Sequence, residues 1–199
     1  MRKIIKFLQK NNSKKIFLVT GRKSYSLSGF SEEIRLLEKD FKFTRFYNFE
    51  TNPKIEDVKK GVKLYNENNC DLIISVGGGS VLDMGKLISS FINENLLQKS
   101  ELISVMNSFE RKCPLLLVPT TAGSGSEETT FAVLYINNIK YSVNNESLYP
   151  DELILNPKYS YSMNANQKAV SGLDAFTQCI ESYWSKNATK ESRKYSIDG

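Results

Sequence analysis

The sequence contains no histidine and few cysteines. Its three cysteines, Cys70, Cys113 and Cys179, lie far apart along the 199 residues. Zinc sites combine closely spaced cysteines and histidines, and disulfide frameworks need paired cysteines. The sequence therefore indicates neither a zinc cluster nor a disulfide framework, and we expect a cytoplasmic protein.

Long hydrophobic runs are also missing. A membrane-spanning helix needs about 20 mostly apolar residues, and no stretch approaches that length. Residues 1–12 combine basic residues with an apolar patch, but Lys6 interrupts the patch before it reaches the length of a signal-peptide core. We therefore expect no membrane segment and no secretion signal.

The charge is modestly basic. The chain has 27 Lys and Arg against 22 Asp and Glu, a net charge of +5. Because the basic residues are spread along the chain and balanced locally by acidic ones, we interpret them as a solvated surface and expect no nucleic-acid partner. A positive field of this size favours an anionic cofactor or substrate.

Strand-like and helix-like segments alternate, which is typical of a parallel sheet covered by helices. The expected strands are residues 16–20, 43–49, 72–76, 115–118 and 152–157. The expected helices are residues 31–39, with Ser31 as a cap, 55–67, a helix after the glycines at 77–79, and a long one over 166–187. Residues 131–136 and 139–143 flank Asn137 and Asn138, which tolerate positive φ and favour a two-residue hairpin turn. A domain boundary is expected near 158–165.

The segment GGGSVLDMGK, residues 77–86, lies between an expected buried strand and an expected helix. Glycines at such a turn let backbone N–H groups approach a pyrophosphate, and the start of the helix favours an anion. Ser80 either caps the helix or contacts the phosphate. The alternative is a tight turn without a ligand, because the segment matches neither the Rossmann GxGxxG pattern nor a Walker loop.

A second loop, PTTAGSGSEET at residues 119–129, follows the next buried strand. It is expected at the same carboxyl edge of the sheet, where open α/β folds bind nucleotides. Hydroxyl groups that can contact ribose, phosphate or carboxamide come from Thr120, Thr121, Ser124 and Ser126. Gly123 and Gly125 leave room for a cofactor.

The order GGGSxxDxxK, PTTAGSGSE and GLDAFTQCIE spans nearly the whole chain. It is similar to the iron-containing (group III) alcohol dehydrogenases, which interconvert alcohols and carbonyls with NAD or NADP. The resemblance implies an α/β fold: a Rossmann-like parallel-sheet nucleotide-binding domain, here residues 1–160, followed by the start of an all-helical, dehydroquinate synthase-like domain, residues 161–199. That second domain carries a divalent metal, iron or zinc, and we expect this chain to end before the metal site is complete.

The resemblance also implies roles for individual residues. Gly77, Gly78, Gly79 and Ser80 would bind the pyrophosphate, Thr120, Thr121 and Ser126 would line the ribose side, and Asp83 would order the loop. Asp174 matches the first metal ligand of the family. Four residues later the family usually has a histidine, where this sequence has Gln178, a weak neutral oxygen donor. This departure puts metal affinity and metal identity in doubt.

The residues after the first strand bear on the choice of cofactor. Many NAD-using members have an acidic residue there, whereas this chain has Gly21, Arg22, Lys23 and Ser24. Without a carboxylate to repel a 2′-phosphate, the chain is expected to accept NADP as well as NAD. The alternative is that Arg22 and Lys23 are merely solvated.

Two functional hypotheses follow. The first is an NAD(P)- and metal-dependent alcohol dehydrogenase or aldehyde reductase with a small-molecule alcohol or aldehyde as substrate. LVTGRKSYSLSGF and GLDAFTQCIESYWSKNATKES look like the branch with phosphonoacetaldehyde reductases, so an anionic aldehyde is one option. The second is a truncated, non-catalytic remnant that binds nucleotide only. A homo-oligomer is left open in both.

Overall fold

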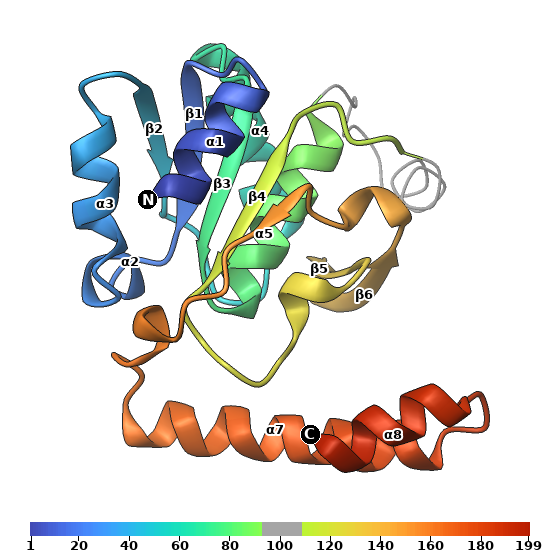
Figure 1. The fold of residues 1–199 in the computed structure, drawn as a ribbon. Coiled ribbons are helices and arrows are strands. Elements are labelled where there is room, and N and C mark those ends of the chain that lie inside the picture. Colours follow the sequence, from blue (N-terminus) through green and yellow to red (C-terminus); the bar gives the residue numbers. More distant parts are fainter. Residues whose placement is uncertain (93–108) are drawn as a thin grey trace.

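A five-stranded parallel sheet with helices on both faces forms the centre of the chain (Figure 1). The computed structural model describes residues 1–92 and 109–199. The strands are β1 (Lys15–Thr20), β2 (Lys42–Phe46), β3 (Leu72–Gly77), β4 (Leu115–Pro119) and β7 (Glu152–Leu153), in the order β2-β1-β3-β4-β7. All neighbouring strands pair in parallel. The predicted α/β fold is therefore confirmed.

Alternate strand residues pack into two separate hydrophobic cores, one on each face of the sheet, because successive side chains of a strand point to opposite faces. Ile16 and Leu18 pack with α1 (Arg2–Lys10) and α3 (Phe30–Leu37), while Phe17 and Val19 pack with α4 (Ile55–Glu67) and α5 (Gly79–Phe91). The central strands β3 and β4 contribute to both cores. Their apolar runs reflect burial on both faces, as is typical of parallel sheets.

The helix α5 lies between the sheet and an antiparallel hairpin, β5 (Phe131–Ile136) and β6 (Ile139–Asn144). Residues 82–91 of α5 are all buried as a result. Asn137 and Asn138 have φ values of 50° and 62°, as the predicted two-residue turn requires. The hairpin prediction is confirmed.

Several predicted boundaries are wrong. The helix expected to be capped by Ser31 begins at Phe30, after Gly29 in a left-handed conformation with φ 79°, so Ser31 lies inside its first turn. The strand expected over 43–49 ends at Phe46. The last strand, expected over 152–157, is only Glu152–Leu153, and a 3-10 turn, η3 (Pro157–Ser160), soon follows.

Three α-helices, namely α1, α2 (Ser24–Leu27) and α8 (Lys190–Asp198), were not predicted. The short α2 precedes α3, and α1 occupies the amino-terminal segment. In α1 the residues Ile4, Phe7 and Leu8 are buried at helical spacing, and they pack on the sheet. The stability of α1 depends on this packing, because so short a helix is only marginally stable in isolation.

The chain ends in two helices, α7 (Ala165–Trp184) and α8 (Lys190–Asp198), which contact each other below the sheet in Figure 1. Asn164 and Gln167 form a reciprocal capping box that starts α7. None of the 20 residues of α7 is buried, and Val170, Leu173 and Phe176 are each more than half exposed. Within the described ranges, no helix has the length and apolar character needed to cross a membrane.

Candidate functional site

The strand order creates a crevice between β1 and β3. From β1 the chain passes to β2 on one side, and it then crosses over to β3 on the other side. Ligands in open α/β folds bind outside the carboxyl ends of the strands at such a switch point. Gly21 follows β1 and Gly77 ends β3, so the glycine loops lie at the expected place.

A cavity of about 480 Å³ occupies this crevice. Its lining includes six of the predicted cofactor-binding residues: Gly21, Gly78, Gly79, Ser80, Thr120 and Thr121. The segment before α7 and the first turn of that helix contribute Met163, Asn164 and Gln167, which the sequence did not predict. The cavity is therefore bounded by four segments distant in sequence, within residues 21–27, 78–81, 120–121 and 162–167, together with Thr51.

A second hollow, of about 390 Å³, continues the crevice past the end of β2. It shares Gly21 and Ser80 with the first cavity, and its walls include Tyr47 and Phe49. Polar glycine turns at one end and aromatic side chains at the other suit an elongated ligand with a charged part and a flat apolar part.

The backbone at Gly21 is fixed by Arg45, which the sequence did not indicate as a site residue. Its guanidinium donates to Thr20 Oγ1 at 2.8 Å and to the Gly21 carbonyl at 3.2 Å. The same group lies 4.4 Å from the ring centre of Tyr25 and 4.5 Å from that of Tyr47. Its neighbour at the site, Arg22, donates to Asn48 Oδ1 at 2.7 Å.

The three consecutive glycines at the end of β3 lack a side chain for different structural reasons. A Cβ on Gly77 would lie 2.5 Å from Cβ of Val81, and one on Gly78 would lie 3.1 Å from the Thr121 methyl group. Gly79 is open, since its nearest neighbour would be Ser124 Oγ at 3.8 Å. Only the missing side chain of Gly79 therefore leaves free space in the crevice.

The helix α5 begins at Gly79, so the amide groups of its first turn lie at the crevice. These N–H groups have no helical carbonyl to bond, and the helix end favours an anion. Ser80 does not cap the helix, because the N-cap is Gly78 and the Ser80 hydroxyl accepts from the Asn52 amide at 3.3 Å. The capping alternative for Ser80 is thus wrong, and its side chain lines the cavity instead.

The second loop brings an unsatisfied hydroxyl to the cavity. Thr120 is 2% exposed, and its Oγ1 has no hydrogen-bond partner among the described residues. A buried polar group without a partner is costly, which points to a ligand or water at that position. Thr121 lies beside it against Gly78.

Ser124 and Ser126 do not line the cavity. Ser124 Oγ accepts from the Ser126 amide at 3.4 Å, and Ser126 Oγ donates to Asp83 Oδ1 at 2.9 Å. Asp83 also accepts from the Val133 amide at 3.1 Å, and burial raises the pKa of its carboxyl. These contacts hold the loop to α5, while a direct role in cofactor binding stays a prediction for all three residues.

The two predicted metal ligands lie one turn apart on α7. Gln178 Nε2 donates to Asp174 Oδ2 at 3.1 Å, and both residues are exposed. No group of three or more Asp, Glu, Cys or His suited to a metal occurs within residues 1–92 and 109–199. Catalytic zinc sites use three protein ligands, so Asp174 and Gln178 alone do not make a metal site.

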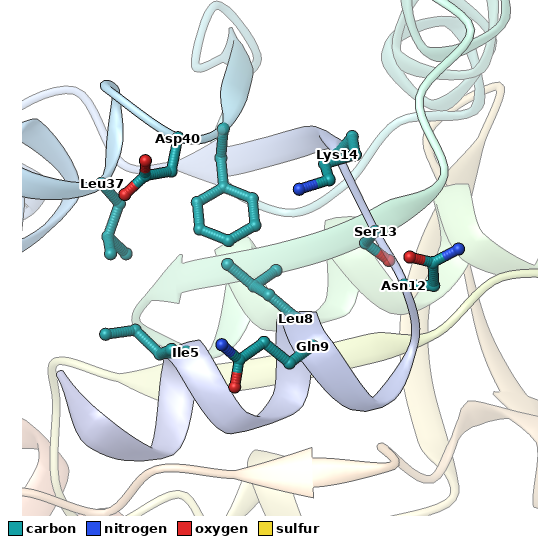
Figure 2. Close-up of a pocket in the computed structure, with 9 residues that line it drawn as sticks. Ile5, Leu8, Gln9, Asn12, Ser13, Lys14, Leu37 and Asp40 are labelled. Carbon is teal, nitrogen blue, oxygen red and sulfur yellow. The ribbon is translucent and has the colours of Figure 1, made fainter.

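Another cavity, of about 360 Å³, lies at the opposite, amino-terminal edge of the sheet (Figure 2). Ile5 and Leu8 of α1 and Leu37 of α3 form apolar parts of its lining, and Lys14 and Asp40 lie at its polar side. The buried Ser13 hydroxyl there also lacks a partner among the described residues. Neither glycine loop reaches this cavity, so the crevice at β1 and β3 is the better candidate.

Comparison with known proteins points to one family. The sequence model described as iron-containing alcohol dehydrogenase matches residues 1–157. The chain is 30% identical to NADH-dependent butanol dehydrogenase B of Clostridium acetobutylicum, over 90% of this chain and 47% of that protein. It is 31% identical to NAD-dependent methanol dehydrogenase of Bacillus methanolicus, over 96% and 50%. The chain thus spans about half the length of these curated relatives.

Solved structures of similar fold include enzymes named as alcohol dehydrogenases and as an aldehyde reductase. The alcohol dehydrogenase from Oenococcus oeni superposes with a TM-score of 0.85 at 27% identity, covering 98% of this chain and 52% of that one. Sulfoacetaldehyde reductase from Bifidobacterium kashiwanohense, solved with NAD⁺, gives 0.81 at 26% identity, covering 92% and 49%.

Proposed function

This chain belongs to the iron-containing alcohol dehydrogenase family, and on that premise we propose that the crevice between β1 and β3 binds NAD or NADP. The chain then supplies the nucleotide-binding part of an oxidoreductase that acts on alcohols and aldehydes. We propose the same division as in the family: a nucleotide-binding domain over residues 1–160 and the start of a helical domain over 161–199.

The convergence of both polar loops on one 480 Å³ cavity is the observation that carries this proposal. The first-turn amides of Gly79 and Ser80 would hold the pyrophosphate, where the start of α5 favours negative charge. Thr120 would give its unpartnered hydroxyl to the cofactor. A bound nicotinamide accepts or delivers hydride, and the residues around it orient the ring and keep water away.

We propose that the site accepts both NAD and NADP. Gly21 carries no carboxylate that would repel a 2′-phosphate, and Lys23 lines the cavity as a cation. Arg22 lines the neighbouring hollow, although its guanidinium already bonds Asn48. Use of NAD is further supported by the names of the butanol and methanol dehydrogenase relatives.

The substrate proposal is a small alcohol or aldehyde, with an anionic aldehyde such as phosphonoacetaldehyde as the finer option. A net charge of +5 suits an anionic substrate. The similarity to a sulfoacetaldehyde reductase supports the same class, because that enzyme is named for an anionic aldehyde.

A narrower function is favoured for residues 1–199 taken alone. Asp174 and Gln178 are two exposed oxygen donors, one of them neutral, and no group of three suitable residues accompanies them in the described part of the chain. We therefore propose that these 199 residues bind nucleotide without metal-dependent turnover, and we derive no catalytic step through a metal here.

The proposal is tested by calorimetric titration of NADH into the wild type and Gly79→Val. The valine side chain enters open space in the crevice and should weaken NADH binding about tenfold or more without disturbing the fold. Gly172→Val is the matched control, since Gly172 is also an open helical glycine but lies on α7 outside the cavity. Equal NADH affinity in the wild type and Gly79→Val would rule out this site.

A further inference from the structure

A fully buried lysine lies on α5, two turns from the start of the helix. Lys86 is 0% exposed, although lysine is almost never fully buried in proteins unless it is paired. No ion pair of Lys86 occurs among the described residues, so groups other than a carboxylate must stabilise its buried charge.

Backbone carbonyls surround the Lys86 ammonium. Its Nζ donates to the carbonyl oxygens of Ser126 and Thr129, both at 2.7 Å, and to that of Phe131 at 3.0 Å. Thr129 Oγ1 lies 3.1 Å away as a fourth acceptor. An ammonium has three N–H donors, so each carbonyl can receive one. The Lys86 side chain thereby links the short 3-10 helix η1 (Ser126–Glu128) and the start of β5 to helix α5 through hydrogen bonds to its ammonium group.

Asp83, one turn earlier on the same helix, binds this segment at two further points, Ser126 Oγ and the Val133 amide. The segment is continuous with the loop that places Thr120 and Thr121 in the crevice. The helix whose first turn faces the crevice therefore also anchors the far end of the opposing loop.

We propose that Lys86 is a positioning residue, whose positive charge holds residues 120–131 against α5 and thereby sets the affinity of the crevice for the dinucleotide. This inference rests on the proposed function, since the dinucleotide supplies the readout. Lys86 does not line the cavity, so it acts through the loop.

The charge on Lys86 is open to change near neutral pH. Burial lowers the pKa of Lys86 to about 8, while Asp83 on α5 and Glu127 in η1 act in the opposite direction. Below this pKa the ammonium satisfies all three carbonyls. Above it the neutral amine has one N–H fewer and no charge, so the loop should loosen and NADH affinity should fall as pH rises through about 8.

The test compares NADH affinity from about pH 7 to about pH 9.5 in the wild type, Lys86→Met and Lys63→Met. The wild type should lose about tenfold in affinity across this range, and Lys86→Met should bind weakly at every pH with a flat profile. Lys63 is an exposed lysine of α4, so Lys63→Met should follow the wild type. A flat wild-type profile, or a profile of Lys86→Met parallel to the wild type, would overturn the inference.

Hydrogen exchange of the amides in residues 120–131 provides a second readout. In the wild type, their exchange should accelerate above about pH 8 beyond the intrinsic dependence shown by exposed α8 amides. This measurement needs no variant, so it stands if Lys86→Met does not fold. If the wild type binds no NADH at any pH, the proposed function fails, and the exchange result then decides whether Lys86 positions the loop. Unchanged protection of the loop would refute that role.

Discussion

At the scale of single residues, the three consecutive glycines at 77–79 have different structural roles. Gly77 permits the side chain of Val81 to fold back over the end of β3, and Gly78 permits the contact with Thr121. Gly79 alone faces open space. The sequence motif predicts all three as phosphate-binding residues, but the packing separates two that close the turn from one that leaves room for a ligand.

Gly21 is where cofactor discrimination should be decided. A Cβ there would lie 2.2 Å from Ser24 Oγ, which can rotate away, and a longer side chain would enter both hollows. Gly21→Asp should weaken NADPH more than NADH by about 1 to 2 kcal/mol, because its carboxylate repels the 2′-phosphate. Titrations of both cofactors provide the measurement.

Gly21→Ala is the control for this experiment, because it introduces the same Cβ without the charge. It should change the affinities for NADPH and NADH alike. If Gly21→Asp also changes both alike, residue 21 does not face the adenosine ribose.

The sequence predicted the cavity residues that follow strand ends, such as Thr120 and Ser80, because strand and loop chemistry are local patterns. It did not predict Arg45 or the buried contacts of Lys86. Those roles depend on hydrogen-bond partners more than 20 residues away in the chain, such as Thr20 for Arg45. Spacing along the sequence carries no signal for such partners.

At the scale of elements, β4 carries Thr120 to the crevice and is anchored at its other end by an ion pair. Arg111 binds both carboxylate oxygens of Asp151, which also accepts from the Leu115 amide at 2.8 Å. Burial opposes ionisation of Asp151, but the hydrogen bonds from Arg111 and Leu115 prevail and lower its pKa. A lowered pKa means that the carboxylate stabilises the fold above its unfolded pKa, and that this stability is lost as pH falls.

Asp151→Asn should therefore lower the free energy of unfolding by about 1 kcal/mol near neutral pH, a modest value because the carboxylate is partly exposed. Urea denaturation at several pH values measures the difference from the wild type, which should shrink as pH falls below about 4. Asp198→Asn, at an exposed site in α8, should have no effect. A deficit that is the same at every pH would show that the charge of Asp151 is not what stabilises β4.

Elements with strong local patterns were predictable, and elements that depend on tertiary contacts were not. The apolar runs of β3 and β4 and the asparagine pair of the hairpin are local signals. By contrast, α1 is stabilised by burial of Ile4 and Leu8 on the sheet, and β7 is shortened by the turn that begins near Asn156. The helical spacing of Ile4, Phe7 and Leu8 is a local signal for α1, but so short a helix depends on the sheet beneath it. The early end of β7 has no such signal in a short window of sequence.

At the scale of the whole molecule, several distant segments line the crevice, whereas the two predicted metal ligands are exposed. Asp174 and Gln178 lie on a helix without a buried residue. Two weak donors should lose a divalent metal to water and buffer, so the carbonyl of an aldehyde would not be polarised. The 199-residue chain should therefore show no metal-stimulated NADH or NADPH oxidation with short aldehydes or phosphonoacetaldehyde.

This prediction is checked by assays with added iron, zinc or manganese, repeated after chelation. Asp174→Ala serves as the control for any activity that does occur. Metal-stimulated turnover that disappears in Asp174→Ala would show that further ligands, such as those of a second copy of the chain, complete the site.

Binding of a dinucleotide between the carboxyl ends of β1 and β3 is tested most directly by NADH titration of the isotope-labelled chain, followed through its amide NMR spectrum. Binding at this crevice should produce the largest shifts at Gly21, Gly79 and Ser80. The absence of any shift would contradict this expectation, and so would shifts confined to Lys14 and Asp40 at the cavity on the opposite edge of the sheet (Figure 2).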